Sequence, residues 1–496
     1  MSRRVEFDTI TPAPPSPAYS RPSTPPSLEP RTSSYPPSEI LQSIGDGVLT
    51  TEATRQSSLR NLNLEQGEGT GVSLPPTDRG RGAWEFALAA FILETFIASP
   101  DAPPWGYSYS FATILVYLQS TPPWSSSSLS ALSAIGSCQI GIQFCLSPFV
   151  VIVFRRYPDW VKASLWVSLV VSCGSMLLSS WATKVWQLIA LQGIICGATG
   201  AILYTPVWIW LIEWFVERRG LAGGIIWSGT GIGGFVFPFL FSGLLSKVGF
   251  AWMVRVWALI TAVVFAFAVY IVKPRIPPPR VRKGERGPWP AFPWKVLIDP
   301  IFVGMALASL FASLSTFPVS LYLATYASSL TTSAFAAEIV VGIYNIAASV
   351  GCTALGYVSD LSYTGATILC GVLGTAIALF AWGWADTLAK TYGFAVLFGF
   401  SSQMIVAWSG ATRDVAGQDP YAAALVYCLL SVVRGVASMV MPLVSQKLYD
   451  PAQKGDATSW GRFGFLRMIV FVGVTSFVSA IAGVALEFMR RKYKKA

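Results

Sequence analysis

The chain has 496 residues, of which 53% are hydrophobic, 14% are aromatic and only 12% carry a charge. Soluble globular proteins carry about twice that charged fraction, so this chain has too little polar surface to cover a water-soluble particle of its size. The mean hydropathy is +0.54. Although the net charge is +10, Lys and Arg collect in short loops between apolar blocks, which indicates a membrane protein and argues against a nucleic-acid-binding protein.

Residues 1–82 are rich in Pro, Ser and Thr and have no periodic apolar pattern. A segment of this composition cannot bury enough apolar surface to offset the entropy of ordering, so we expect a disordered cytosolic tail. No apolar stretch opens the chain, and no cleavable signal peptide is expected. Ser-Pro and Thr-Pro pairs at Thr11, Ser16 and Thr24 are candidate phosphorylation sites.

Twelve apolar spans follow the tail, each long enough to cross about 30 Å of hydrocarbon. A basic, proline-rich linker, 273–296, divides them six from six. The first six spans are 84–119, which is interrupted, 129–153, 160–182, 185–212, 220–245 and 251–272, and the second six are 297–325, 333–357, 366–384, 390–411, 421–446 and 465–489. The predicted fold is an all-α membrane protein with two pseudo-symmetric six-helix halves, 83–272 and 297–489, and a basic cytosolic tail, 490–496.

The distribution of basic residues sets the expected orientation. Thirteen Lys and Arg lie in the loops on the side of the central linker, against eight in the loops on the other side. Cytosolic loops are enriched in Lys and Arg, and an even number of spans puts both termini on one side of the membrane. We therefore expect both termini and the linker in the cytosol, and we expect the plasma membrane in preference to an internal membrane.

Several function classes lack the residues that they require. The seven cysteines all lie inside apolar blocks, so neither a disulfide framework nor a metal site is expected. The chain has no histidine, the commonest general base, and no G-x-x-x-x-G-K-[ST] sequence that would hold ATP. We therefore expect no enzymatic activity and no cofactor or metal. Neither nucleotides nor nucleic acids are expected as partners.

The stretch Arg218–Gly234, RRGLAGGIIWSGTGIGG, formally matches the G-x-G-x-x-G dinucleotide fingerprint. That fingerprint needs a preceding strand and a helix that opens onto water, whereas this stretch lies inside an apolar span. At about 100° per residue, four glycines fall on one helix face, where small residues allow close helix packing. These four are Gly220, Gly224, Gly231 and Gly234, and Gly229 and Gly233 fall nearly opposite. Span five is therefore expected to press against helices on both sides.

The run Glu213–Gly224, EWFVERRGLAGG, resembles the span 4–5 signature of the monocarboxylate transporter family within the major facilitator superfamily, and is most similar to its fungal branch. Weaker matches are Gln192-Gly193, Gly197, Tyr204-Thr205-Pro206, Gly233-Gly234 with Pro238, and Gly356-Tyr357-Val358-Ser359-Asp360. The resemblance covers roughly 84–489. It implies the major facilitator fold, in which two halves rock around a site near the membrane midplane.

The resemblance also implies a function. We expect a secondary transporter that moves a small organic solute across a lipid bilayer by alternating access, coupled to protons. The solute would be an organic acid, a vitamin-like compound or a secondary metabolite. The alternative from another class is a transporter-like sensor, which binds the solute without moving it and signals through the N-terminal tail.

Three positions depart from the animal members of that family. The family's substrate-binding arginine in span eight and the aspartate one turn earlier fall on Cys352 and Ala348, and its lysine in span one falls on Tyr109. The lactate–proton mechanism is therefore not transferred to this chain. The loop after span two also lacks the acidic residue of the general facilitator loop motif, which the second half keeps as Asp360.

Span one contains an insertion. Between Glu94 and Ser110 it reads TFIASPDAPPWGYSY, with three prolines and an aspartate that would break a helix. Removing the residues from Ala98 to Pro104 restores a helix of ordinary length. The insertion is either an unwound element of the site or an artefact of the gene prediction.

Two charged residues lie deep in apolar spans. Glu94 lies about 15 Å from the start of span one, and Arg434 lies about 20 Å from the start of span eleven, so both are near the midplane. An unpaired charge at that depth costs several kcal/mol, so each should face the central cavity or a partner. We expect Arg434 to hold an anionic or polar group of the solute and Glu94 to couple protons. The alternative is a static ion pair between them, or charges satisfied by backbone groups and water.

Other residues are candidates for the solute site and for a gate. The side chains expected to line the cavity are Tyr109, Tyr204, Trp208, Asn345, Gln403 and Trp408. The aromatic members favour a solute with apolar or ring surface. Five charged residues lie at the cytosolic ends of spans four, five and eight: Glu213, Glu217, Arg218, Arg219 and Asp360. We expect them to latch the closed conformation. The alternative is membrane anchoring by the arginines, with solvated glutamates.

Overall fold

The computed structural model describes residues 74–97, 111–278, 286, 289–290, 292–417, 419–450, 452 and 460–495. Residues Leu74–Ala496 belong to one compact unit. Most of the predicted disordered tail, the insertion in span one and much of the predicted linker lie outside the described residues.

All regular secondary structure in the described residues is helical. In the first half the helices are α2 (Arg81–Ile97), α3 (Phe111–Ser120), α4 (Leu129–Arg156), η1 (Pro158–Trp160), α5 (Val161–Ser179), α6 (Val185–Leu188), η2 (Ile189–Ile195), α7 (Cys196–Trp214) and α8 (Arg219–Ile271). After the linker they are α9 (Trp294–Leu297), α10 (Pro300–Ser328), α11 (Ala334–Leu361), α12 (Tyr363–Ala376), η3 (Ile377–Trp382), α13 (Leu388–Ser401), η4 (Met404–Ala407), α14 (Trp408–Ala416), α15 (Pro420–Leu448) and α16 (Leu466–Lys495).

Ten helical stretches of the described chain are long and apolar enough to cross a membrane. One of them, α8, has 53 residues, a length of about 80 Å that is more than twice the hydrocarbon thickness. Its backbone turns at Gly249 (φ 74°, ψ 175°), a conformation that glycine adopts without a Cβ clash, so α8 provides two crossings. With α2 and α3 as the interrupted first span, these helices account for the twelve predicted spans. The predicted fold class is confirmed.

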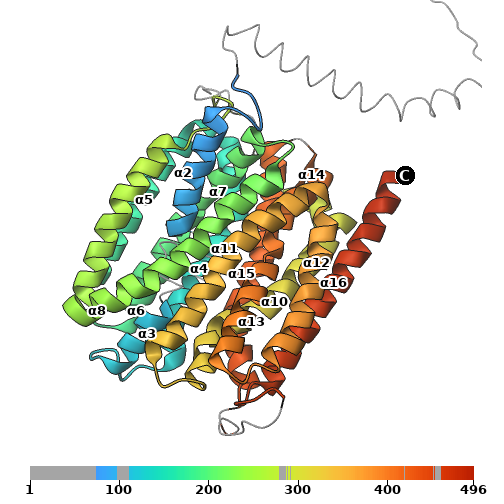
Figure 1. The fold of residues 1–496 in the computed structure, drawn as a ribbon. Coiled ribbons are helices and arrows are strands. Elements are labelled where there is room, and N and C mark those ends of the chain that lie inside the picture. Colours follow the sequence, from blue (N-terminus) through green and yellow to red (C-terminus); the bar gives the residue numbers. More distant parts are fainter. Residues whose placement is uncertain are drawn as a thin grey trace, which may run out of the picture. The chain divides into compact units, whose positions relative to one another are not determined.

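The long helices of the compact unit run side by side (Figure 1), and the start of α2 and the end of α16 lie at the same end of the bundle, as an even number of crossings requires. This end also carries the α7–α8 and α11–α12 turns, and we call it the Asp360 end. There Asp78, just before α2, bonds to the α7–α8 turn, and Arg490 of α16 bonds to Asp414 of α14.

Helix α8 touches helices on two sides through its glycines. A Cβ atom added to Gly220, Gly224 or Gly231 would collide with backbone carbonyl oxygens of α11. On the other side, a Cβ atom added to Gly229 or Gly233 would lie 2.6 Å from carbonyl oxygens of α2. Because α8 belongs to the first half and α11 to the second, the absence of side chains brings the two halves into backbone contact.

A second pair of helices, α4 and α15, joins the halves elsewhere in the bundle. There Gly435 of α15 faces Phe144 of α4, and Gly141 of α4 faces Met439 of α15. Here glycines are opposed by side chains, which can adjust, whereas between α8 and α11 glycines are opposed by backbone. The α8–α11 contact is therefore the more rigid of the two.

Span ten is present, and it contains a break that its apolar pattern does not predict. Helix α13 ends at Ser401, and the backbone leaves the α conformation at Ser402 and Gln403 (φ −90°, ψ 45°) before η4 and α14 resume the span. The side-chain amide of Gln403 donates to the carbonyl oxygen of Gly399 at 2.9 Å, the acceptor that the backbone amide of residue 403 would use in a helix. The side chain thus stabilises the break, which local apolar patterning does not reveal.

Alanine substitution of two glycines in α8 should give opposite results. Glycine to alanine in a helix stabilises by about 1 kcal/mol when nothing opposes it, and Gly243 has no atom within 4 Å of an added Cβ. An added Cβ at Gly224 meets the carbonyl of Cys352, and such overpacking costs about 1–3 kcal/mol. We expect Gly224→Ala to lower the melting temperature of the purified protein and Gly243→Ala to leave it equal or higher. Equal melting temperatures for the two variants would contradict the close contact.

Candidate functional site

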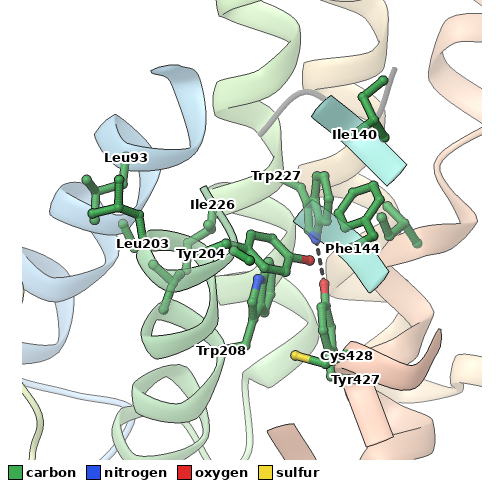
Figure 2. Close-up of a cluster of buried hydrophobic side chains, with 14 of the residues drawn as sticks. Leu93, Ile140, Phe144, Leu203, Tyr204, Trp208, Ile226, Trp227, Tyr427 and Cys428 are labelled. Carbon is green, nitrogen blue, oxygen red and sulfur yellow. Dashed lines mark hydrogen bonds between the residues drawn. The ribbon is translucent and has the colours of Figure 1, made fainter. Parts of the chain in front are cut away.

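Aromatic side chains from both halves meet in the middle of the junction (Figure 2). The ring of Trp208 on α7 stacks on that of Tyr427 on α15, with centroids 4.1 Å apart and an interplanar angle of 16°. Trp208 also lies 5.7 Å from the ring of Trp227 on α8. The indole N–H of Trp227 donates to the hydroxyl of Tyr427 at 2.6 Å. These three rings join the halves by stacking and by one buried hydrogen bond.

Two of the predicted lining residues extend this group. Tyr204, fully buried on α7, lies 3.3 Å from the hydroxyl of Ser431 on α15. Trp408 on α14 packs edge-on against Tyr427, and its indole N–H donates to Ser309 on α10 at 2.6 Å. We call Tyr204, Trp208, Trp227, Trp408 and Tyr427 the central aromatic cluster. All five are buried, so a solute could reach them only after the halves separate.

The two deep charges are both buried near this cluster. Glu94 is 0% exposed, and within the described part of the chain neither of its carboxylate oxygens has a hydrogen-bond partner. Arg434 is 6% exposed, and its guanidinium lies over the ring of Phe317 at 5.1 Å. Both residues lie within electrostatic range of Tyr204 and Cys352. No ion pair between Glu94 and Arg434 is present among the described residues, so the alternative of a static pair is not what this conformation contains.

The remaining residues predicted to line the cavity are Gln403, Asn345 and Tyr109, and the structure describes the first two. The side-chain oxygen of Gln403 accepts a hydrogen bond from the thiol of Cys352 at 3.4 Å. Gln403 therefore lies beside Cys352, which is within electrostatic range of Glu94 and Arg434. Asn345 on α11 is 0% exposed and donates to the carbonyl oxygen of Gly234 on α8 at 3.0 Å. It therefore joins the halves directly in this conformation. Tyr109 lies outside the described residues.

At the Asp360 end, a carboxylate of the second half caps a helix of the first. The oxygens of Asp360 accept from the backbone amides of Gly220 at 2.6 Å and Leu221 at 2.8 Å. These amides are among the unpaired donors of the first turn of α8, where the helix dipole also favours a negative charge. Close by, Arg413 donates to the carbonyl oxygen of Val216 at 2.6 Å.

A related contact joins α4 to α15 at the same end. Asp419 caps α15 by accepting from the amides of Tyr421 and Ala422, and it forms an ion pair of 3.1 Å with Arg155 of α4. The loop after span two lacks the acidic residue of the facilitator motif, as the sequence indicates. At this contact the N-cap residue of α15 itself, Asp419, supplies the capping carboxylate, and Arg155 at the end of α4 pairs with it.

Within the described chain, the predicted gate residues at the α7–α8 turn do not pair with one another, and each contacts another group. Glu213 accepts from the backbone amides of Arg275 and Ile276, at 3.1 and 3.3 Å. Burial lowers the pKa of the Arg275 guanidinium, and the carboxylate of Glu213 opposes that shift. Arg219 is buried and donates to the carbonyl oxygen of Phe215.

The other two gate residues, Glu217 and Arg218, are exposed. Their backbone amides, with that of Val216, donate to the carboxylate of Asp78 at 2.9–3.1 Å. Asp78 thus closes the turn from the segment before α2. Among the described residues, no ion pair joins any two of the four charged residues from 213 to 219.

Sequence reasoning missed several residues of these contacts. Asp78 lies in a segment whose composition is that of the tail, and nothing local marks it as a cap. Tyr427 had a usable signal, because it precedes Arg434 by two helical turns and so shares its face. Trp227 had one too, as the bulky residue on the glycine face of span five.

Comparison with known proteins identifies relatives along most of the chain. Residues 86–442 match the sequence model of the Major Facilitator Superfamily. The chain is 26% identical over 434 residues to the fujikurins efflux protein of Gibberella fujikuroi, covering 85% of this chain and 86% of that protein. It is 27% identical over 381 residues to the aspyridones efflux protein apdF of Emericella nidulans, covering 76% and 74%.

Among solved structures, the human organic anion transporter MFSD10 (TETRAN) matches with a TM-score of 0.54 and 12% identity. The match covers 82% of this chain and 97% of that one. At this identity the likeness concerns the fold alone.

Removing the Asp360 carboxylate should free the first turn of α8. Loss of a helix-capping carboxylate costs about 1 kcal/mol, or about fivefold in a local opening equilibrium. In hydrogen–deuterium exchange, Asp360→Ala should therefore speed exchange of the segment around Gly220 and Leu221 about fivefold. Asp386→Ala, which removes a carboxylate paired with Lys390 outside this contact, should leave that segment unchanged. Equal exchange in wild type and Asp360→Ala would contradict the cap.

Proposed function

The chain belongs to the Major Facilitator Superfamily of membrane transporters, and we propose that it exports a small organic solute by alternating access, in exchange for protons. Two relatives that align along most of its length are named as efflux proteins, which favours export over uptake. The rings of the central aromatic cluster favour a solute with apolar or ring surface, such as a secondary metabolite.

One observation carries this proposal: Glu94 is fully buried, and neither of its carboxylate oxygens has a hydrogen-bond partner among the described residues. A charge removed from water without a partner is costly. Glu94 therefore carries a proton in this conformation and releases it when the site is open to water. Arg434 holds an acidic or polar group of the solute, while the rings hold its apolar part.

The cycle uses the contacts of the Asp360 end as a latch. When Asp360 leaves the amides of α8 and Asp419 leaves Arg155, the halves part at this end and the solute enters. When the contacts reform, the solute is released on the other side and Glu94 is reprotonated from there. The Asp360 end faces the cytosol, as the distribution of Lys and Arg predicts, and the protein lies in the plasma membrane.

The position within the superfamily is also part of this proposal. The run Glu213–Gly224 favours the monocarboxylate porters, in their fungal branch. Because Cys352, Ala348 and Tyr109 replace the ionisable residues of the animal members, the solute need not be a monocarboxylate. The sensor alternative has no support among the two relatives, both of which are named for efflux.

Replacing Glu94 tests proton coupling. Wild-type proteoliposomes would first be screened with aromatic acids and neutral aromatic compounds under a proton gradient, and the compound best transported becomes the probe. Glu94→Gln should abolish gradient-driven accumulation of that probe while retaining solute exchange without a gradient, because an amide cannot release a proton. The control is Glu85→Gln, an exposed carboxylate on the same helix, which should behave as wild type. Gradient-driven accumulation by Glu94→Gln would remove Glu94 from coupling, and binding of the probe without any flux in wild type would support the sensor.

Replacing Arg434 tests the assignment of the solute's charge. Arg434→Gln should weaken binding of an acidic aromatic probe at least tenfold, the effect of losing a hydrogen bond to a charged group. Binding of the neutral analogue should change less than about threefold, since stacking on the rings remains. Lys447→Gln, which removes an exposed cation from the end of the same helix, is the control. Equal losses for both probes would indicate a structural role for Arg434.

A further inference from the structure

A small polar pocket of about 40 Å³ lies at the Asp360 end, between the two halves. Three arginines line it: Arg219 from the first turn of α8, Arg413 from α14 and Arg490 from α16. The hydroxyl-bearing residues Ser359 and Ser362 also contribute to its wall. One water needs roughly 10–15 Å³ of such space, so the pocket is large enough for a small ion.

The two carboxylates that line this pocket already have partners. Asp360 accepts from the amides of Gly220 and Leu221. Asp414 accepts from the guanidinium of Arg490 and from the hydroxyl of Tyr363, at 2.9 and 2.8 Å. The carboxylates therefore do not neutralise the other two arginines through direct contact.

Arg219 and Arg413 have no ion-pair partner in the part of the chain that the structure describes. Arg219 is only 4% exposed, and its Nη1 has no hydrogen-bond partner among the described residues. The carboxylate of Asp78 attracts Arg219 without contacting it, because its oxygens accept hydrogen bonds from the three amides of the α7–α8 turn. The positive charge of Arg413 repels that of Arg219. A buried cation without a contacting anion is costly, and a bound anion would remove that cost.

We propose that this pocket is a binding site for a phosphoryl oxyanion, held by Arg219 and Arg413. A guanidinium binds phosphate oxygens through paired N–H groups, and two of them around one pocket suit a tetrahedral anion. Because Arg219 belongs to the first half and Arg413 to the second, the bound anion bridges the halves. It stabilises the conformation in which the Asp360 end is closed. The consequence for flux, a slower cycle at high phosphate, rests on the proposed transport function, whereas the binding does not.

Thermal unfolding of the purified full chain with inorganic phosphate tests the binding. Phosphate should raise the melting temperature with a saturable dependence that sodium chloride of equal ionic strength does not reproduce. In Arg413→Gln the half-saturating phosphate concentration should rise at least tenfold, because one charge-assisted contact is lost. Arg219→Lys, which keeps the charge but loses the fork of N–H groups, should weaken binding in the same direction. Arg218→Gln, the exposed neighbour, should match wild type.

Vesicles distinguish a free anion from a lipid headgroup. Wild type and Arg413→Gln would be reconstituted in phosphatidylcholine with and without phosphatidic acid. Stabilisation by phosphatidic acid that Arg413→Gln loses supports the site with a lipid source, even where inorganic phosphate has no effect. The proposal is overturned when neither phosphate nor phosphatidic acid stabilises wild type beyond the salt control, or when Arg413→Gln and Arg218→Gln respond alike. A wild type that binds phosphate but moves no solute retains the site and loses only the proposed function.

Discussion

The backbone contact between α8 and α11 is the constraint on which the rest of the structure depends. Three glycines of α8 face carbonyl oxygens of α11 closely enough to exclude any side chain, so the register of the two helices is fixed to within a fraction of a turn. That register sets Asp360 against the first amides of α8 and Asn345 against the carbonyl of Gly234. Because packing in lipid lacks the hydrophobic drive that it has in water, this contact depends on close packing and on hydrogen bonds between the helices.

In the proposed cycle, polar contacts at the Asp360 end therefore decide which conformation is populated. A helix-capping carboxylate contributes about 1 kcal/mol and an exposed ion pair about 0.2–1 kcal/mol, so the contacts of Asp360, Asp419 and Arg413 together hold the Asp360 end closed by a few kcal/mol at most. Differences of this size shift a two-state equilibrium by factors of about ten to several hundred. The middle of the junction is different in kind, because stacked rings meet there and the buried charges Glu94 and Arg434 are not paired with each other.

The sequence predicts the fold because span length, apolar blocks and the position of the basic linker are local properties. It also identifies Glu94 and Arg434, since a charge inside an apolar span is conspicuous without a structure. Which residues of the two halves contact each other does not follow from the neighbouring sequence. Periodicity places the glycines of α8 on one face but does not say that this face meets α11. Nothing local shows that Asp78 and Asp360 cap the α7–α8 turn. The break at Gln403 is hidden for the same kind of reason, because a side chain replaces a backbone donor.

The central claim is that the Asp360 end opens and closes. Spin labels at Arg218 and Leu361, both exposed and on opposite halves, would report the gap by pulsed electron paramagnetic resonance, in a variant whose seven native cysteines are replaced. The account predicts two distance populations in lipid nanodiscs, with the longer one growing when Asp360 is replaced by alanine and changing in proportion on acidification. A single short distance that persists under both changes would contradict it.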